Sequence, residues 1–286
     1  MEILWDTLTE AGWGVRLAAV GTAPLQQTWH YGAVAATFGA RVGRAVVRDG
    51  GHEVAIAQVL SRRGMRLVSR GPVWLDCDEP GHRRAVLRRL ARAPLIATPA
   101  EAVAGFGLMP LLTPRHHAIW DLSPSPDALR GRMAPKWRAD LAVAERAGLR
   151  LSPAPAALEA LIAAETAQRQ TRRYRALPPD FARTWGTGAS RVLSWGQAGR
   201  TEAAVQVLCH GPWASYHLAW ASEAGRQARA HWAMLWQMAL WLRARGVRMF
   251  DLGDVDTERS PGLARFKLGT GAGLVRLGAT CLVLPG

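Results

Sequence analysis

The turn-forming run Ser123-Pro-Ser-Pro126 constrains the fold of this chain most, because it cannot lie inside a regular helix or strand. On both sides of it, short apolar runs typical of strands alternate with amphipathic helical segments. Neither half shows the strict strand–helix–strand repetition of a doubly wound parallel sheet. We therefore place a domain boundary here and predict two mixed α+β domains, residues 1–125 and residues 126–286.

Each half is predicted to combine one sheet with a few helices. In the first half, the predicted helices cover residues 26–38 and 80–92, and the predicted strands cover 44–47, 53–59, 65–69, 94–98 and 117–121. In the second half, the predicted helices cover residues 135–147, 155–170 and 228–245, and the predicted strands cover 191–195, 203–210, 213–220, 247–252 and 274–284.

Length and composition indicate a globular protein. The chain has 286 residues, of which 49% are hydrophobic, enough for one large or two ordinary cores. Its most apolar stretch, 232–242, is shorter than the ~20 residues that span a bilayer. The N-terminal segment lacks the pattern of a secretory signal, so we expect a cytoplasmic protein. The widely spaced Cys77, Cys209 and Cys281 disfavour disulfides and structural zinc.

The charge indicates an anionic partner. The formal net charge is +14, which favours contact with polyanions such as RNA, with anionic cofactors or with lipid headgroups. All basic residues except Lys136 and Lys267 are arginines. Where Arg is the default, a retained Lys marks a site that suits a compact ammonium group.

The last third of the chain carries the most specific pattern. It reads Tyr216-His-Leu-Ala-Trp-Ala-Ser-Glu-Ala-Gly-Arg226, then Phe250-Asp-Leu-Gly-Asp-Val-Asp-Thr257, then Pro261-Gly-Leu-Ala-Arg-Phe-Lys-Leu-Gly269. Weaker matches upstream are Gln27-Thr-Trp29, Arg70-Gly-Pro-Val73 and Lys136-Trp-Arg138. Together these segments resemble the Fem family of aminoacyltransferases, within the GNAT superfamily of acyltransferases.

The resemblance implies a fold and an activity. It implies two tandem GNAT-like domains, each a mixed sheet flanked by helices, with a cleft between them, and a C-terminal strand in 272–286 that returns to the first domain. It also implies transfer of an aminoacyl group from aminoacyl-tRNA to an amine acceptor, such as a peptide, an aminolipid or a small metabolite.

Two residues are the catalytic candidates. Lys267 matches the position where the family places a cation that stabilises negative charge on the oxyanion or the leaving oxygen. Asp254, in the acidic loop before it, is suited to accept a proton from the incoming ammonium group. Strand alternation predicts that Phe266 and Lys267 face opposite sides, so Phe266 either stacks on substrate or packs in the core.

Further candidates contact the substrates. Tyr216 and Trp220 are predicted to share one face of a strand and to form a binding wall. The resemblance places acceptor contacts at Gln27, Trp29, Arg70 and Asp76. His217 and the pair His116-His117 are interpreted as structural, because the sequence shows no acidic partner for them.

The donor is the least determined part of the prediction. The segment Arg226-Gln-Ala-Arg229-Ala-His231 lacks the glycines with which acetyltransferases cradle the pyrophosphate of CoA, which favours aminoacyl-tRNA over acyl-CoA. The predicted RNA-binding residues are Lys136, Arg138, Arg172, Arg173, Arg175, Arg226 and Arg229.

Two alternatives stay open. One is an acyl-CoA-dependent N-acyltransferase, and the other is a non-catalytic RNA- or anion-binding protein that keeps only the basic surface. No metal, no DNA partner and no cofactor beyond the acyl donor is expected.

Overall fold

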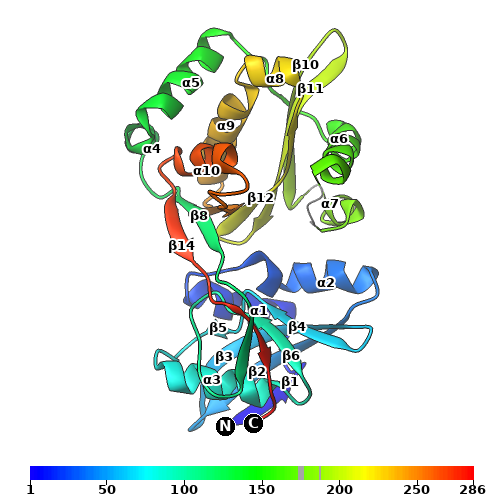
Figure 1. Cartoon of the computed structure of the whole chain (residues 1–286), viewed down its shortest axis with the longest axis vertical. Coiled ribbons are helices and arrows are strands. Elements are labelled where there is room, and N and C mark those ends of the chain that lie inside the picture. Colours follow the sequence, from blue (N-terminus) through cyan, green and yellow to red (C-terminus); the bar gives the residue numbers. More distant parts are fainter. Residues whose placement is uncertain (173–176, 187) are drawn as a thin grey trace. The chain divides into compact units, whose positions relative to one another are not determined.

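The structure is a computed structural model that describes residues 1–172, 177–186 and 188–286, with the side chain of Arg172 left undescribed. The chain divides into two compact units (Figure 1). The first consists of Met1–His116 and Val275–Gly286, and the second of His117–Leu274. The strand β8 (His116–Asp121) therefore begins at the division.

The first unit is built on one sheet. Its strands are β1 (Glu2–Trp5), β2 (Arg41–Asp49), β3 (His52–Arg62), β4 (Met65–Ser69), β5 (Val73–Trp74), β6 (Leu95–Thr98), β7 (Leu108–Leu112) and β15 (Thr280–Val283). Their order is β1-β2-β3-β4-β6-β15-β7, and β5 pairs with β3. The C-terminal β15 thus lies between β6 and β7 and is antiparallel to both.

Helices cover this sheet. They are α1 (Glu10–Ala19), the short 3₁₀-helix η1 (Leu25–Gln27), α2 (Trp29–Thr37) and α3 (Pro80–Leu90). Glu79 caps α3 by accepting bonds from Gly81 N and His82 N, and Pro80 occupies the first turn. Its apolar stripe, Val86, Leu87 and Leu90, joins the main core of the unit.

The second unit contains a second sheet, ordered β14-β8-β13-β12-β11-β10-β9. Its strands besides β8 are β9 (Ser152–Pro153), β10 (Ser190–Gln197), β11 (Arg200–His210), β12 (Trp213–Ala221), β13 (Met249–Asp254) and β14 (Gly273–Arg276). Its helices are α4 (Pro126–Arg132), α5 (Pro135–Arg146), α6 (Ala157–Arg172), α7 (Pro179–Thr184), α8 (Glu223–Gln227), α9 (Ala230–Ala244) and α10 (Pro261–Leu268).

The second sheet is covered on both faces (Figure 1). Residues of α4, α5 and α9 form the larger core with one face, and α6 and α7 pack on the other. The apolar helix α9 is buried along most of its length, which explains its high content of Met, Leu and Trp. Within the described residues, no helix is both long and apolar enough to cross a bilayer.

The structure differs from the predicted elements in several places. The strand predicted at 117–121, at the end of the first domain, is β8 of the second sheet. Ser123-Pro-Ser-Pro126 starts a helix, since the Ser125 hydroxyl accepts a bond from Ala128 N and Pro126 occupies the first turn of α4. The single strand predicted at 274–284 is two strands, β14 and β15, in different sheets. Gly278 separates them and passes so close to Glu101 O that a Cβ there would lie 2.4 Å from it.

Candidate active site around Lys267

The helix α10 presents the lysine of the Phe-Lys pair. Pro261 occupies the first turn, and the helix ends where Gly269 packs against Trp137 of α5. The Trp137 indole nitrogen donates to Phe266 O over 2.9 Å, which satisfies a carbonyl of the last turn. The interpretation of this segment as a strand was wrong, because a short run with a Pro at its start forms one amphipathic helix that buries Ala264 and Lys267.

Phe266 packs in the core of the second unit. Its ring lies edge-on to Trp232 at 5.1 Å and contacts Trp137 at 6.0 Å and His231 at 6.4 Å between centroids. Of the two readings left open by the sequence, core packing is the one observed.

Lys267 is buried and only 7% exposed. Its ammonium group donates to Asp254 O over 2.7 Å. Burial lowers the pKa of Lys267 to about 8, against the opposing pull of the Asp254 and Asp251 carboxylates. The side chain therefore exchanges its proton near neutral pH, unlike an ordinary lysine.

The backbone of β13 that lies next to the Lys267 ammonium group is irregular. The ladder to β8 shifts between Asp251 and Asp254, and Gly253 has φ +82°. A Cβ on Gly253 would lie 3.5 Å from Lys267 Nζ. The Gly253 amide donates to Asp251 Oδ1 over 2.7 Å, so the bulged backbone is tied to a carboxylate.

A histidine that sequence reasoning left as structural belongs to this site. His117 Nδ1 lies 2.9 Å from Asp251 Oδ1 and 3.1 Å from Asp251 Oδ2. Both side chains are largely buried, 17% and 13% exposed. The expectation that His117 lacks an acidic partner was wrong, because the partner arrives through the pairing of β8 with β13.

Strands β12 and β13 separate beside these residues. Their parallel ladder runs from Trp213↔Met249 to Ser215↔Asp251, whereas β12 continues to Ala221 along β11. Asp251 therefore stands where the two strands part, and Lys267 and Asp254 lie next to it. The exposed carboxylate of Asp254 completes a site with one buried cation and one accessible base.

The predicted wall of Tyr216 and Trp220 does not form. Tyr216 packs against the core under α9, and Trp220 packs against the core under α6. The cause is a bulge opposite Gln206 and Val207, which inserts one residue into β12 and reverses the alternation. Burial raises the pKa of the Tyr216 hydroxyl and, together with Arg169, lowers that of His217 to about 4.

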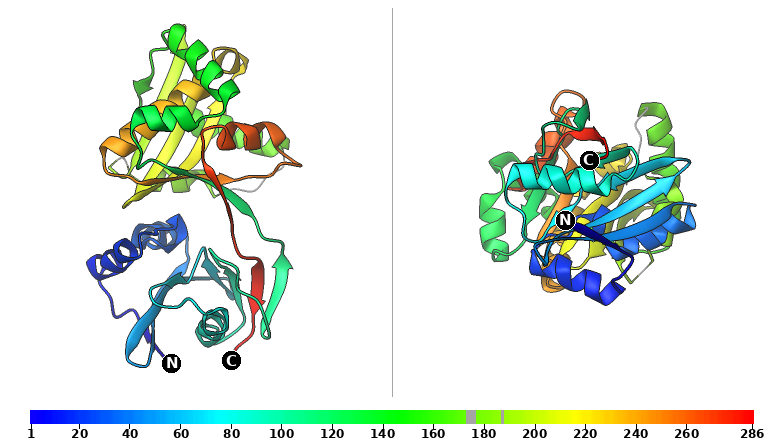
Figure 2. Two further views of the ribbon diagram at one scale, coloured as in Figure 1. Left: turned by 90° about the vertical axis from the view of Figure 1, so that its left-hand side faces the viewer. Right: turned by 90° about the horizontal axis from the view of Figure 1, so that it is seen from below.

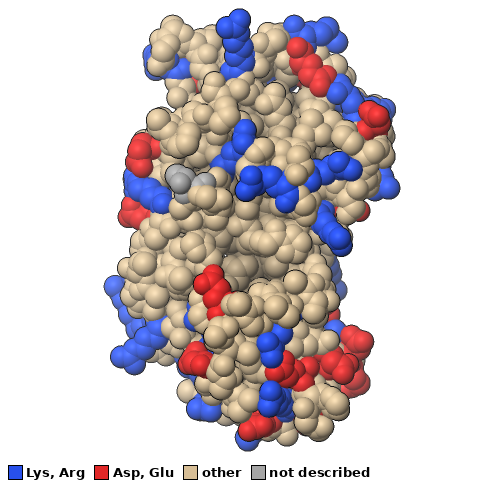
Figure 3. Space-filling model, turned by 180° about the vertical axis from the view of Figure 1, so that it is seen from behind, with Lys and Arg blue, Asp and Glu red and all other residues tan. Residues whose placement is uncertain are grey.

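The predicted donor-binding residues form a partly connected group. Lys136 Nζ and Arg229 Nε both contact the Asp140 carboxylate, at 3.3 and 3.0 Å. Arg226 bonds Glu223, and Arg138 donates to Gly131 O. Arg173 and Arg175, and the side chain of Arg172, lie outside the described residues. Figure 3 shows a band of Lys and Arg side chains near the middle of one face of the second unit.

The predicted acceptor residues lie in the first unit and are only partly brought together. Gln27 is fully buried, and its amide nitrogen donates to Ser69 O over 2.8 Å, beside Arg70. Trp29 stacks under the guanidinium of Arg44 at 3.5 Å. Asp76 is exposed, and its backbone amide bonds Val54 O.

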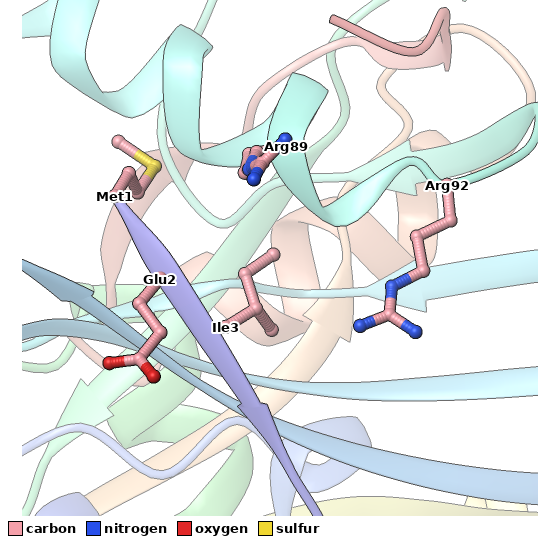
Figure 4. Close-up of a pocket in the computed structure, with 5 residues that line it drawn as sticks. All are labelled: Met1, Glu2, Ile3, Arg89 and Arg92. Atoms are coloured by element: carbon pink, nitrogen blue, oxygen red, sulfur yellow. The ribbon is translucent and has the colours of Figure 1, made fainter.

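Two hollows lie away from all of these residues. One of about 380 Å³ is lined by Met1, Glu2, Ile3, Arg89 and Arg92, where Figure 4 shows the start of β1 beside the end of α3. Another of about 320 Å³ lies between α5 and α9. Across the described ranges, no group of three or more His, Cys, Asp or Glu side chains could hold a metal ion.

Comparison with solved structures identifies the fold. FemX aligns with a TM-score of 0.79 over 99% of this chain and 98% of its own, at 14% identity. The C-terminal domain of a putative lysylphosphatidylglycerol synthetase from Agrobacterium fabrum aligns with a TM-score of 0.56 over 97% and 93%, at 14% identity.

A tandem GNAT protein from the clavulanic acid biosynthesis pathway aligns with a TM-score of 0.53 over 98% of this chain and 97% of its own, at 17% identity. No family model matches the sequence, and a search of curated proteins finds no match. The expected mixed α+β architecture is confirmed: this chain has the tandem GNAT-like fold that FemX also has.

Proposed function

We propose that this chain is an amide-forming transferase that moves an aminoacyl group from aminoacyl-tRNA to an amine acceptor. The observation that carries the proposal is Lys267, a buried ammonium group with a pKa of about 8 that is bonded to Asp254 O of β13. It lies near Asp251, where β12 and β13 separate. Burial of a cation costs stability, but a buried cation stabilises developing negative charge more strongly than an exposed one.

The reaction needs no covalent enzyme intermediate. The neutral amine attacks the ester carbonyl carbon, the new C–N bond forms, and the C–O bond to the tRNA ribose then breaks. Lys267 stabilises the oxyanion or gives its proton to the departing ribose oxygen. The exposed Asp254 carboxylate takes the proton that the acceptor ammonium group loses before its neutral amine attacks. After the attack the nitrogen loses a second proton, which balances the proton that the ribose oxygen gains.

The pair His117 and Asp251 supports this arrangement. The Asp251 carboxylate raises the pKa of Lys267, so it favours the charged form that the reaction uses. Its bonds to His117 and to Gly253 N fix the turn of β13 that faces the ammonium group. We assign both as positioning residues.

The N-terminal end of α9 and the segment before it support a tRNA donor. Arg229 begins this helix with φ +55°, and its side chain is held by Asp140. The segment 226–231 contains no glycine, so its backbone is less able to approach a pyrophosphate closely. The net charge of +14 agrees with a polyanionic donor.

A donor screen tests the proposal. Purified protein is incubated with a pool of charged tRNA, or with acyl-CoAs, plus cell extract as the source of acceptor, and the labelled acyl group is followed. We expect deacylation of tRNA coupled to a labelled amide, lost in Lys267→Ala and kept in Leu263→Ala, an exposed position of the same helix. Release of CoA instead would identify an acyl-CoA enzyme, and no turnover with either donor would favour a non-catalytic anion-binding protein.

A further inference from the structure

An apolar patch lies on one edge of the first unit. It consists of five exposed side chains, Phe106, Met109, Leu111, Leu112 and Leu284, which we call the edge patch. The last strand of the sheet, β7, supplies three of them, and all its residues after Leu108 are exposed. Figure 2 shows β7, in green, beside the red β15 at the outer edge of the sheet.

Main-chain bonds hold the patch together. The Leu284 amide donates to Gly107 O over 2.9 Å, which places Leu284 next to the loop that carries Phe106. Leu112 pairs with Thr280 of β15 at the other end of the strand. The exposed side chains therefore lie along β7, on the loop before it and just after β15, and are not scattered over the surface.

Phe106 is presented to solvent by its backbone. The ring is 83% exposed, and it stands between Gly105 and Gly107, whose φ angles are +120° and +87°. A Cβ on either glycine would lie 2.4 Å from the guanidinium group of Arg84 or Arg88. The positive φ angles favour glycine at both positions, and the loop lies closely on the two arginine side chains of α3.

The same arginines give the patch a positive border. The Arg88 guanidinium lies 5.3 Å from the centroid of the Phe106 ring, and its Nη2 donates to Pro285 O. The nearby carboxylates Asp78 and Glu101 both bond Arg83, the residue before Arg84. An apolar rim bordered by Arg84 and Arg88 is complementary to a surface that is apolar inside and anionic at its headgroups.

The edge is poorly suited to pair with another strand. Pro110 has no amide hydrogen to donate, and the ladder between β7 and β15 shifts at Leu111. Both features blunt an edge against strand addition by a peptide or by a second copy of the chain. The exposed apolar side chains are thus not explained as half of a continuous intermolecular sheet.

We propose that the edge patch docks the protein onto an anionic lipid bilayer. Phe106 and the leucines of the patch enter the boundary between headgroups and acyl chains, while Arg84 and Arg88 contact the anionic headgroups. This inference is independent of the reaction at Lys267, because the patch belongs to the first unit and Lys267 to the second.

Co-sedimentation of the full chain with vesicles tests the proposal. We expect the protein to pellet with phosphatidylglycerol vesicles in 0.1 M salt and much less with phosphatidylcholine vesicles. The double variant Phe106→Ser, Leu111→Ser should bind phosphatidylglycerol about tenfold or more weakly, because two large apolar side chains leave the membrane. Arg84→Gln with Arg88→Gln should weaken binding as well, since each basic residue near an anionic surface adds to it.

Val15→Ser and Val143→Ser are matched controls, since both valines are exposed, 67% and 44%, on helices that contribute no residue to the patch. They should bind as the wild type does. No pelleting with phosphatidylglycerol, or equal pelleting of the Phe106/Leu111 variant, would overturn the proposal. So would a dimer, seen by sedimentation velocity, that the same double variant abolishes.

Discussion

The two units each bury a polar cluster, and the two clusters are built from different chemistry. In the first unit, Gln27 and Gln58 are 0% and 1% exposed, and their neutral amides bond backbone groups of η1, β3 and β4. In the second unit, Lys267 and Asp251 are titratable groups held beside a bulged strand. Neutral amides fix the path of the chain at any pH, whereas a buried ammonium group stores free energy that depends on its proton.

The largest expected effect on stability comes from breaking the neutral cluster. Gln58 donates to Gln26 O and Thr28 O and accepts from Arg44 Nε. Gln58→Leu leaves these buried groups without the side chain that bonds them, so we expect the free energy of unfolding to fall by about 4 kcal/mol. The loss should be the same at pH 6 and pH 9, as measured by urea unfolding.

The matched control is Gln26→Leu, because Gln26 is half-buried and contributes its backbone carbonyl to the cluster. Its effect should be well under half of that of Gln58→Leu. Equal losses in the two variants would show that the amide bonds of Gln58 are not what stabilises this region.

Replacing Lys267 should change how stability depends on pH. The unfolded chain keeps the proton of a lysine up to pH 10.5, whereas the folded chain releases it near pH 8. The unfolded state therefore binds more protons between these values, so stability rises with pH across that window and is lost as pH falls through 8. The full difference is about 3 kcal/mol, since a tenfold change in an acid constant equals about 1.4 kcal/mol.

Lys267→Met removes the contribution of this lysine to the pH dependence of stability. We expect the free energy of unfolding of the wild type, relative to the variant, to increase between pH 8 and pH 10.5, measured by urea unfolding at several pH values. Parallel pH curves for the two proteins would mean that Lys267 is not perturbed in the folded chain.

A smaller effect, on the pKa of Lys267, is expected from replacing Asp251. Asp251 raises the pKa of Lys267, so Asp251→Asn should lower that pKa below about 8. Labelling the side-chain nitrogen of lysine suits this test, because Lys136 and Lys267 are the chain's only lysines and give two signals. The Lys136 signal, from a side chain 86% exposed, serves as the internal reference and should not move. If Lys267 titrates at the same pH in Asp251→Asn as in the wild type, Asp251 does not influence the lysine and has no role in the site.

Most of the architecture could be predicted from local patterns. The strand at 65–69 was predicted to the residue, and the helix at 80–92 was found within a few residues because its apolar residues recur with helical periodicity. The helix at 228–245, also found within a few residues, is a long apolar run that ends before Gly246. The segment with Phe266 and Lys267 was misread, since eight residues with a Pro at the start are too few for periodicity to separate helix from strand.

The geometry of the site could not be predicted in the same way. His117 and Asp251 are 134 residues apart, and only the pairing of β8 with β13 brings them together. The separation of Tyr216 from Trp220 depends on one inserted residue in β12, which leaves no mark in the alternation of the sequence. Lys267 could be singled out because it matches the family's position in the Phe-Lys pair and because lysine is rare in this chain, but its burial and its bond to Asp254 O could not be predicted.

The central claim is that charged Lys267 stabilises the transition state of acyl transfer. It is tested most directly by the rate of aminoacyl transfer, measured between pH 6 and pH 9 for the wild type and for Lys267→Met under single-turnover conditions. We expect the wild-type rate to fall above pH 8 as Lys267 loses its proton, and the variant to be about 10²–10³-fold slower, without that fall. A variant that matches the wild-type rate, or shows the same fall near pH 8, would contradict the claim.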